Sequence, residues 1–167
     1  GADGPIIVQG PERIALDGPN GVGKTTLLEA LLTGDAGRLL TARVGYLPQR
    51  LDHLDDTMSA FDAVSAVSGR QPQAVRAQLA RFLLTADCVA RPVGTLSGGE
   101  RFRVALAQLL LADPPPQLLL LDEPTNNLDL ASVGQLVEAL GGYRGAFIVV
   151  SHDDEFLARL GLRRTLT

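Results

Sequence analysis

Short apolar runs that end in polar residues alternate with stretches of helical periodicity along this chain of 167 residues. The runs 118–121 and 146–150 contain no polar residue, as is typical of central parallel strands covered on both faces. Residues 13–17 and 44–47 are shorter strand candidates, and 6–8 form a further β-type run. Strands alternating with helices predict an α/β protein with a mainly parallel sheet and a ligand crevice at its carboxyl edge.

Helical spacing of apolar residues fills most of the chain between these runs. A helix ending before Gly34 is predicted by one apolar face, formed by Leu27, Leu28, Leu31 and Leu32. Three further faces are those of Phe61, Val64 and Val67, of Val75, Leu79, Phe82 and Leu83, and of Phe102, Ala105, Leu106, Leu109 and Leu110. A last helix, closed by Gly141 and Gly142, is expected from Val133, Leu136, Val137 and Leu140.

The segment 52–112 is too long for a single crossover between strands. We therefore expect it to be a helical subdomain inserted into an α/β core of residues 1–51 and 113–167. Together these parts form one domain, 1–167, because a chain of this size buries about two thirds of its unfolded surface in one core.

Composition narrows the class of protein. A hydrophobic content of 46% indicates a folded globule, and a net charge of −4 gives no overall nucleic-acid signature. We interpret Arg159, Arg163 and Arg164 as a solvated face in preference to a basic patch. The apolar runs are too short to cross a bilayer and the first residues do not resemble a signal peptide, so a cytoplasmic protein without a membrane segment is expected. Cys88, the single cysteine, is expected to be a buried or half-buried thiol.

The strand candidate 13–17 leads into a phosphate-binding loop with the pattern G-x-x-x-x-G-K-[ST]. Glycines let backbone N–H groups turn toward a polyphosphate, the lysine reaches the terminal phosphates, and the hydroxyl of Thr25 ligates Mg²⁺. Lys24 is the only lysine, since the other 14 of the 15 basic residues are arginines. The predicted nucleotide-binding residues are Gly18, Pro19, Asn20, Gly21, Val22, Gly23, Lys24, Thr25 and Thr26.

Two adjacent carboxylates follow the apolar run 118–121. Side chains of neighbouring residues in an extended backbone diverge, so Asp122 and Glu123 can serve different tasks at one site. Asp122 suits the metal shell opposite Thr25, and Glu123 suits the base that orients a water molecule for attack on a γ-phosphate. A solvated strand end is the alternative for a lone acidic pair.

Two polar residues beside other strands are weaker candidates. His152 follows the run 146–150 and could donate to a phosphate or to the attacking water, although a lone histidine there is usually a surface or capping residue. Gln49 could sense the metal and the water, or be an ordinary loop glutamine. The spacing alone does not decide between these interpretations.

The segment Ser97-Gly98-Gly99-Glu100 also has two interpretations. It fits a capping box at the start of an apolar helix. Two glycines exceed what a cap requires, and bare N–H groups at a positive helix end would form a second anion site. Because the chain has one phosphate loop, the second site would serve a different molecule.

These motifs, in this order, resemble those of ATP-binding-cassette ATPases over nearly the whole chain. The segments that carry the resemblance are 18–25, 46–49, 96–100, 118–123, 127–129 and 151–152. The resemblance implies ATP and Mg²⁺ as ligands, Gln49 as the metal- and water-sensing glutamine, Glu123 as the catalytic base and His152 as the switch histidine. It also implies a head-to-tail dimer, in which the signature residues Leu96, Ser97, Gly98, Gly99 and Glu100 face the ATP of a second cassette and Asp129 lies at the interface.

The sequence Glu123-Pro-Thr-Asn-Asn-Leu-Asp129 is most similar to the F subfamily. That resemblance implies a soluble twin-cassette protein acting on ribosomes in translation or antibiotic protection. The chain departs from the subfamily because no aromatic residue precedes Tyr46, and because it has no second cassette and no long charged linker. We therefore expect a piece of a longer protein. The alternatives are the motor subunit of a membrane transporter and an ATP-dependent interaction module with little hydrolysis alone.

Overall fold

The structure, a computed structural model, describes residues 7, 8, 10–19, 21–35, 41–126 and 128–166. Expectations that concern Ile6, Asn20 and Asn127 lie outside these residues. The described strands form one sheet in the order β2-β3-β4-β1-β5, and all neighbouring pairs are parallel. Their bounds are β1 Arg13–Leu16, β2 Val44–Leu47, β3 Leu118–Asp122, β4 Ala146–Val150 and β5 Arg164–Leu166.

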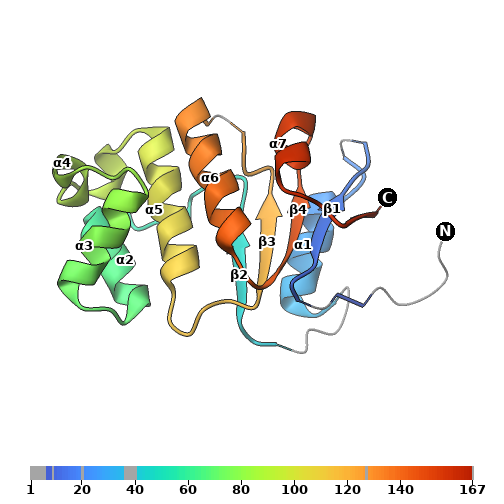
Figure 1. Ribbon diagram of the computed structural model, residues 1–167, viewed down its shortest axis with the longest axis horizontal. Helices are drawn as coiled ribbons and strands as arrows, with labels where there is room; N and C mark the ends of the chain where they lie inside the picture. The colour runs from blue at the N-terminus through green and yellow to red at the C-terminus, as the bar shows by residue number, and fades with distance from the viewer. Residues whose placement is uncertain (1–6, 9, 20, 36–40, 127, 167) are drawn as a thin grey trace.

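Helices cover both faces of the sheet and extend beyond one side of it (Figure 1). Their bounds are α1 Lys24–Thr33, α2 Ala60–Ser68, α3 Pro72–Arg81, α4 Ala86–Val89, the 3₁₀ turn η1 Val93–Thr95, α5 Gly98–Leu111, α6 Leu130–Gly142 and α7 Asp154–Arg159. α1 packs on one face, where Leu28 joins the cluster of Ile14, Leu120 and Ile148. α5, α6 and α7 pack on the other face. The predicted α/β class with a helical insertion is confirmed.

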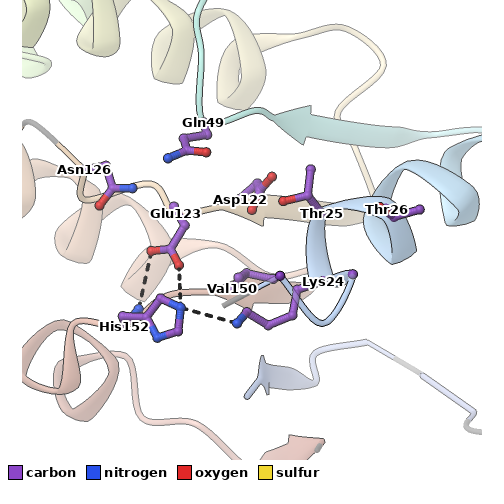
Figure 2. A pocket seen from close by; sticks show the side chains of 11 residues that line it. Lys24, Thr25, Thr26, Gln49, Asp122, Glu123, Asn126, Val150 and His152 are labelled. Atoms are coloured by element: carbon purple, nitrogen blue, oxygen red, sulfur yellow. Dashed lines mark hydrogen bonds and ion pairs between the residues drawn. The ribbon is translucent and has the colours of Figure 1, made fainter. Parts of the chain in front are cut away.

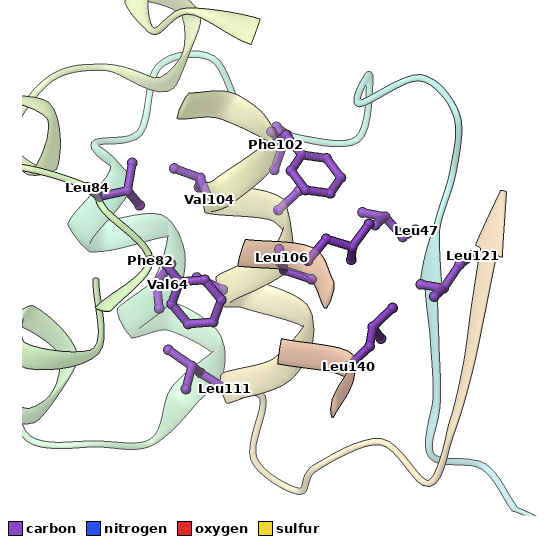
Figure 3. Close-up of a cluster of buried hydrophobic side chains, with 14 of the residues drawn as sticks. Leu47, Val64, Phe82, Leu84, Phe102, Val104, Leu106, Leu111, Leu121 and Leu140 are labelled. Atoms are coloured by element: carbon purple, nitrogen blue, oxygen red, sulfur yellow. The ribbon is translucent and has the colours of Figure 1, made fainter. Parts of the chain in front are cut away.

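α5 connects the inserted helices to the sheet. Its residues Leu106 and Leu111 are buried in one cluster that also contains Val64 of α2 and Leu121 of β3 (Figure 3). Such continuous burial of apolar surface joins the segment that begins at Gly98 and the strand that ends at Asp122 in one core.

The parallel register brings three chain segments to one edge of the sheet. Leu16 of β1 lies opposite Val150 of β4, and Val150 lies opposite Asp122 of β3. The residues that follow these three strands therefore emerge side by side, as expected for a parallel α/β sheet.

α3 ends earlier than its apolar pattern predicts. Leu83 has a positive φ of 56° and is 47% exposed, so it is not part of the buried face. Leu84 takes the buried place instead, and its N–H donates to Leu79 O at 3.0 Å, while Leu83 N–H donates to Ala80 O at 3.0 Å. This pair of bonds is a Schellman motif, which turns the chain one residue before the periodicity ends.

The buried face of α1 is also narrower than predicted. Leu28 is fully buried and Leu31 is half-buried, but Leu27 and Leu32 are 39% and 38% exposed. These two leucines lie at the borders of a face that is wider than the contact between the helix and the sheet. Apolar spacing therefore predicted the helix correctly and its buried stripe only in part.

Several shorter elements differ from expectation. Ile7 and Val8 form no strand. Arg164 belongs to β5 and its guanidinium lies 3.5 Å from a carboxylate oxygen of Glu12. Arg159, Arg163 and Arg164 are all exposed, as a solvated face requires. β5 and α7 were missed because each is very short. The expected closing glycines lie inside the last turn of α6, whose C-cap is Tyr143.

Candidate functional site

A cleft of about 550 Å³ lies at the carboxyl edge of the sheet (Figure 2). Residues from the ends of β1, β2, β3 and β4 line it, as the parallel register requires. The lining residues are Gly21, Gly23, Lys24, Thr25, Thr26, Gln49, Asp122, Glu123, Asn126, Val150 and His152. The structure thus brings together residues that lie up to 131 positions apart, from Gly21 to His152.

The loop after β1 has the backbone that an anion cradle needs. Gly18, Gly21 and Gly23 have φ values of 147°, 78° and 98°, a region that residues with side chains rarely adopt. Gly23 precedes α1 as its N-cap and supplies no side-chain cap. The first N–H groups of α1 are thus left without a side-chain partner at the positive end of the helix, which favours an anion there.

Lys24 folds back over this loop. Its ammonium donates to Gly18 O at 2.5 Å and to Pro19 O at 3.1 Å, and it lies 3.3 Å from His152 Nε2. Within the described part of the chain, no carboxylate forms an ion pair with it. The positive charge of Lys24 is therefore held at the cleft without an acidic neighbour to neutralise it. Val22, also predicted to bind nucleotide, is 62% exposed beside the loop.

Asp122 has the properties of a metal ligand. Its side chain is 1% exposed, and its Oδ1 is buried without a hydrogen-bond partner among the described residues. A buried carboxylate without a partner is costly, and a cation would satisfy it. The side chain of Thr25 lies next to it in Figure 2. Burial, and then the charges of Asp122 and Glu29, raise the pKa of Tyr46, which lies on the neighbouring strand β2, to about 12.

The protein groups at this place fit Mg²⁺ only if a bound phosphate and water supply further oxygens. Among the described residues, no group of three or more His, Cys, Asp or Glu side chains is placed to hold a metal ion. Asp122 and Thr25 supply a carboxylate and a hydroxyl, and Gln49 an amide oxygen. Mg²⁺ is typically bound by one or two protein oxygens together with phosphates and water, which matches this arrangement.

Glu123 points to a different side of the cleft from Asp122 (Figure 2). It has a positive φ of 46°, and its N–H donates to Val150 O at 2.8 Å, which turns the chain sharply after β3. Its carboxylate accepts the His152 backbone N–H at 3.4 Å and lies 3.3 Å from His152 Nε2. The two carboxylates therefore diverge, one toward Thr25 and the other toward His152.

Asn126 is a site residue that the sequence reasoning missed. It was considered only as a marker of the subfamily, but it lines the main cleft together with Gln49 and Glu123. The same three residues also line a second cleft of about 230 Å³, which reaches Gly98 and Arg101 of α5. It reaches the cleft through the tight turn after Glu123, where its N–H donates to Glu123 O at 3.1 Å, and the sequence reasoning used no signal for this turn.

The segment from Leu96 to Glu100 lies outside the main cleft and forms a capping box. Glu100 N–H donates to Ser97 Oγ at 3.3 Å, and Ser97 N–H donates to Glu100 Oε2 at 2.8 Å. The buried Cys88 thiol donates to Glu100 Oε1 at 2.7 Å. This thiol, and then Ser97, lower the pKa of Glu100 to about 2. The capping interpretation is therefore confirmed, while an anion site at this helix end stays a prediction.

Asp129 has a structural role within the chain. It caps α6 by accepting the Ser132 N–H at 2.7 Å, and Arg103 lies 3.4 Å from the same oxygen. The Ser132 backbone hydrogen bond is the main reason why the pKa of Asp129 is lowered. Its neighbour Leu130 is 91% exposed. The expected place of Asp129 at a dimer interface stays a prediction.

Comparisons with known proteins agree with this geometry. A family model described as ABC transporter matches residues 6–126. The chain is 41% identical over 159 residues to the putative ATP-binding protein YdiF of Bacillus subtilis (strain 168), covering 91% of this chain and 24% of that protein. It is 38% identical over 154 residues to ATP-binding cassette sub-family F member 3 of Homo sapiens, covering 87% of this chain and 21% of that protein.

Solved structures share the fold. The archaeal ribosome recycling factor aABCE1, in complex with the ribosomal stalk protein aP1, matches with a TM-score of 0.74 and 29% identity, over 92% of this chain and 31% of that one. A putative ABC transporter ATP-binding protein from Pyrococcus furiosus matches with a TM-score of 0.71 at 22% identity, over 92% of this chain and 88% of that one, and shows the fold alone.

The fold and the phosphate loop define a P-loop nucleoside triphosphatase. The chain belongs to the ATP-binding-cassette family, and the relatives that it resembles are F-subfamily proteins. Domains of this family are ATPases that bind nucleotide, usually with Mg²⁺. The chain spans between a fifth and a third of the length of these relatives, 21% of the human protein and 31% of the Escherichia coli O157:H7 protein YbiT. No described helix is long and apolar enough to span a membrane.

Proposed function

We propose that this chain binds ATP with Mg²⁺ in the 550 Å³ cleft and hydrolyses it as one half of a head-to-tail pair of F-type cassettes. The observation that carries the proposal is the convergence of Lys24, Thr25, Asp122, Glu123 and His152 on that one cleft. A cation, a hydroxyl, an unpartnered carboxylate, a second carboxylate and an imidazole are the groups that phosphoryl transfer to water uses.

Each residue takes the role that its surroundings support. The backbone N–H groups of residues 21–26 and the Lys24 ammonium bind the phosphates, since both are donors without an acidic partner. Asp122 and Thr25 hold the metal, and Gln49 lies beside them. The metal supplies charge neutralisation on the phosphate oxygens. Glu123 accepts the proton of the attacking water, because its carboxylate lines the cleft and points away from the proposed metal ligands Asp122 and Thr25.

His152 positions Glu123 and the terminal phosphate from the side of the cleft opposite Asp122. Its side chain is 46% exposed and is within 3.3 Å of both Glu123 and Lys24. With nucleotide bound, its Nε2 donates to the carboxylate of Glu123 or to a phosphate oxygen. This assignment makes Glu123, His152 and Gln49 the catalytic residues of the proposal.

Pairing is proposed because the signature segment does not line the main cleft and is exposed at Ser97 and Gly98. A Cβ on Gly98 would meet no atom within 4 Å. Beside them, Asp129 and the 91% exposed Leu130 offer a polar and an apolar contact to a second cassette. The division into an α/β core, 1–51 and 113–167, and a helical subdomain, 52–112, belongs to the same proposal, as the part that would move on closure.

Coupling to the ribosome, in translation or in antibiotic protection, is the proposed output. The relatives are F-subfamily proteins, and a structural neighbour is by its description a ribosome recycling factor bound to a ribosomal stalk protein. In this proposal the contacts with the ribosome come from parts of a longer protein. We expect that longer protein to co-sediment with ribosomes and not to co-purify with a membrane protein.

The central test is the substitution Glu123→Gln. We expect the variant to bind ATP, to lose phosphate release and to accumulate as a closed dimer with Mg²⁺ and ATP in size-exclusion chromatography. Glu138→Gln, at an exposed position on α6, is the matched control and keeps the wild-type rate. Normal turnover in Glu123→Gln would rule out the role of Glu123.

The dependence of the rate on protein concentration tests pairing separately. A rate per protomer that rises with concentration indicates that two copies of this chain form the active unit. A rate of zero at every concentration, with ATP binding intact, indicates that the chain needs a different cassette and acts alone only as an interaction module.

A further inference from the structure

One nitrogen of His152 is contacted by two residues with opposite requirements. Its Nε2 lies 3.3 Å from Lys24 Nζ and 3.3 Å from Glu123 Oε1 (Figure 2). An ammonium group can only donate hydrogen bonds, and an ionised carboxylate can only accept them. A neutral imidazole nitrogen carries either a proton or a lone pair, so at any moment Nε2 can bond to only one of these neighbours.

The donors of Lys24 decide which contact forms in this state. An ammonium has three N–H groups, and here three acceptors surround it: Gly18 O at 2.5 Å, Pro19 O at 3.1 Å and His152 Nε2 at 3.3 Å. If Nε2 carried a proton, one donor of Lys24 would face another donor. Nε2 as an acceptor therefore completes the coordination of Lys24.

Glu123 does not depend on the same nitrogen. Its Oε2 accepts the backbone N–H of His152 at 3.4 Å, whichever imidazole tautomer is present. The carboxylate thus keeps a contact with His152 while Nε2 accepts from Lys24. Both observations favour the tautomer with the proton on Nδ1.

We propose that Lys24 is a positioning residue for His152 and sets its tautomer. In the nucleotide-free protein Nε2 carries no proton, and the His152–Glu123 side-chain bond is not formed. A bound triphosphate draws Lys24 away, and the proton moves from Nδ1 to Nε2, which then donates to Glu123. The exchange is balanced, because the half-exposed imidazole releases one proton to water and takes up another.

This inference rests on the proposed function, since it assumes that phosphates attract Lys24. Its consequence is an order of events within the site. The pair of His152 and Glu123 forms only after the phosphate loop is filled, so the loop that binds nucleotide also enables the residues that act on it.

Imidazole ¹⁵N NMR tests the proposal directly, because the chain has two histidines, His53 and His152. The measurement is made at about pH 8.5, where an ordinary imidazole is neutral. His152→Gln assigns the signals and His53 is the internal reference. We expect His152 Nε2 to be the lone-pair nitrogen in the free protein and to become the N–H nitrogen with Mg²⁺ and a non-hydrolysable ATP analogue.

Lys24→Met removes the ammonium and gives the second arm. We expect this variant to have its proton on Nε2 without nucleotide. Arg144→Met, which removes an exposed charge elsewhere, is expected to behave as the wild type.

A proton on Nε2 in the free wild-type protein would overturn the proposal. An unchanged tautomer after addition of nucleotide would also overturn it, provided that the nucleotide displaces a bound fluorescent ATP analogue and is thus shown to bind. Failure to bind nucleotide at all would instead contradict the proposed function, and the tautomers of the free wild-type and Lys24→Met proteins would still test the inference.

Discussion

A Cβ atom on Gly99 would lie 2.9 Å from Oδ2 of Asp129 and 3.1 Å from Oγ of Ser132. The first turn of α5 therefore packs so closely against the start of α6 that a side chain at this position would have to displace the Asp129 carboxylate. Gly98, one residue earlier, has open space around the same position. The two glycines of one motif thus have different explanations. Packing within this chain accounts for Gly99, whereas no contact among the described residues requires a glycine at position 98.

This difference predicts opposite effects of two alanine substitutions. Gly99→Ala should lower the free energy of unfolding by about 1–3 kcal/mol, since it overpacks the contact with Asp129. Gly98→Ala should leave it unchanged or raise it by up to about 1 kcal/mol, because alanine favours helix more than glycine does. Urea unfolding followed by circular dichroism measures both. Equal losses in the two variants would show that the close approach to Asp129 is not the cause.

The capping box at Glu100 predicts a pH dependence of stability. Its pKa is lowered from the usual 4.5 to about 2, so its ionised form stabilises the folded state. This contribution is fully present above the unfolded pKa and is lost as the pH falls through the folded pKa. We expect Glu100→Gln to be less stable than the wild type at neutral pH.

The difference between the two proteins should shrink as the pH is lowered from about 4.5 to about 2. Cys88→Ala should reduce the same pH-dependent difference, because the thiol is the main cause of the lowered pKa. Glu138→Gln is the control and should give a small difference at neutral pH. A Glu100→Gln difference that does not change over this range would contradict the assignment.

The strands that define the fold could be predicted because each is a continuous apolar run with a polar end. β3 and β4 are buried along their whole length, which leaves only apolar residues between 118 and 121 and between 146 and 150. β5 could not be predicted in this way. It has three residues, begins with Arg164 and is a strand only because β1 provides its partner. Tertiary pairing, and not local sequence, makes this element.

The site was predictable to the extent that parallel strands share an edge. That rule brings Lys24, Asp122 and His152 together without any structure. It does not give the direction of a side chain after the strand ends. The contact of His152 with Lys24 depends on the loop returning to place the ammonium on Gly18 O and Pro19 O, and Asn126 reaches the cleft through a turn after Glu123.

The Schellman turn at the end of α3 predicts a stabilising substitution. Leu83 holds a positive φ of 56° and is 47% exposed, so its side chain contributes strain and little burial. Leu83→Gly should raise the free energy of unfolding by about 1 kcal/mol, since glycine adopts this conformation without strain. Leu84→Gly at the buried neighbour is the matched control and should lower it by about 2–5 kcal/mol. A destabilised Leu83→Gly protein would contradict the strain argument.

The unpartnered oxygen of Asp122 predicts how stability responds to metal. In buffer with a chelator, Asp122→Asn should be at least as stable as the wild type, because the substitution removes a buried charge whose Oδ1 has no partner. With Mg²⁺ and ATP the order should reverse, since a ligand stabilises the folded state that it binds, and more so the tighter it binds. Thermal unfolding in the two conditions measures both effects. Asp154→Asn, on the exposed side of α7, should follow the wild type in each. If chelator instead left Asp122→Asn clearly less stable than the wild type, Asp122 would have a structural role in the folded chain and its assignment as a metal ligand would be lost.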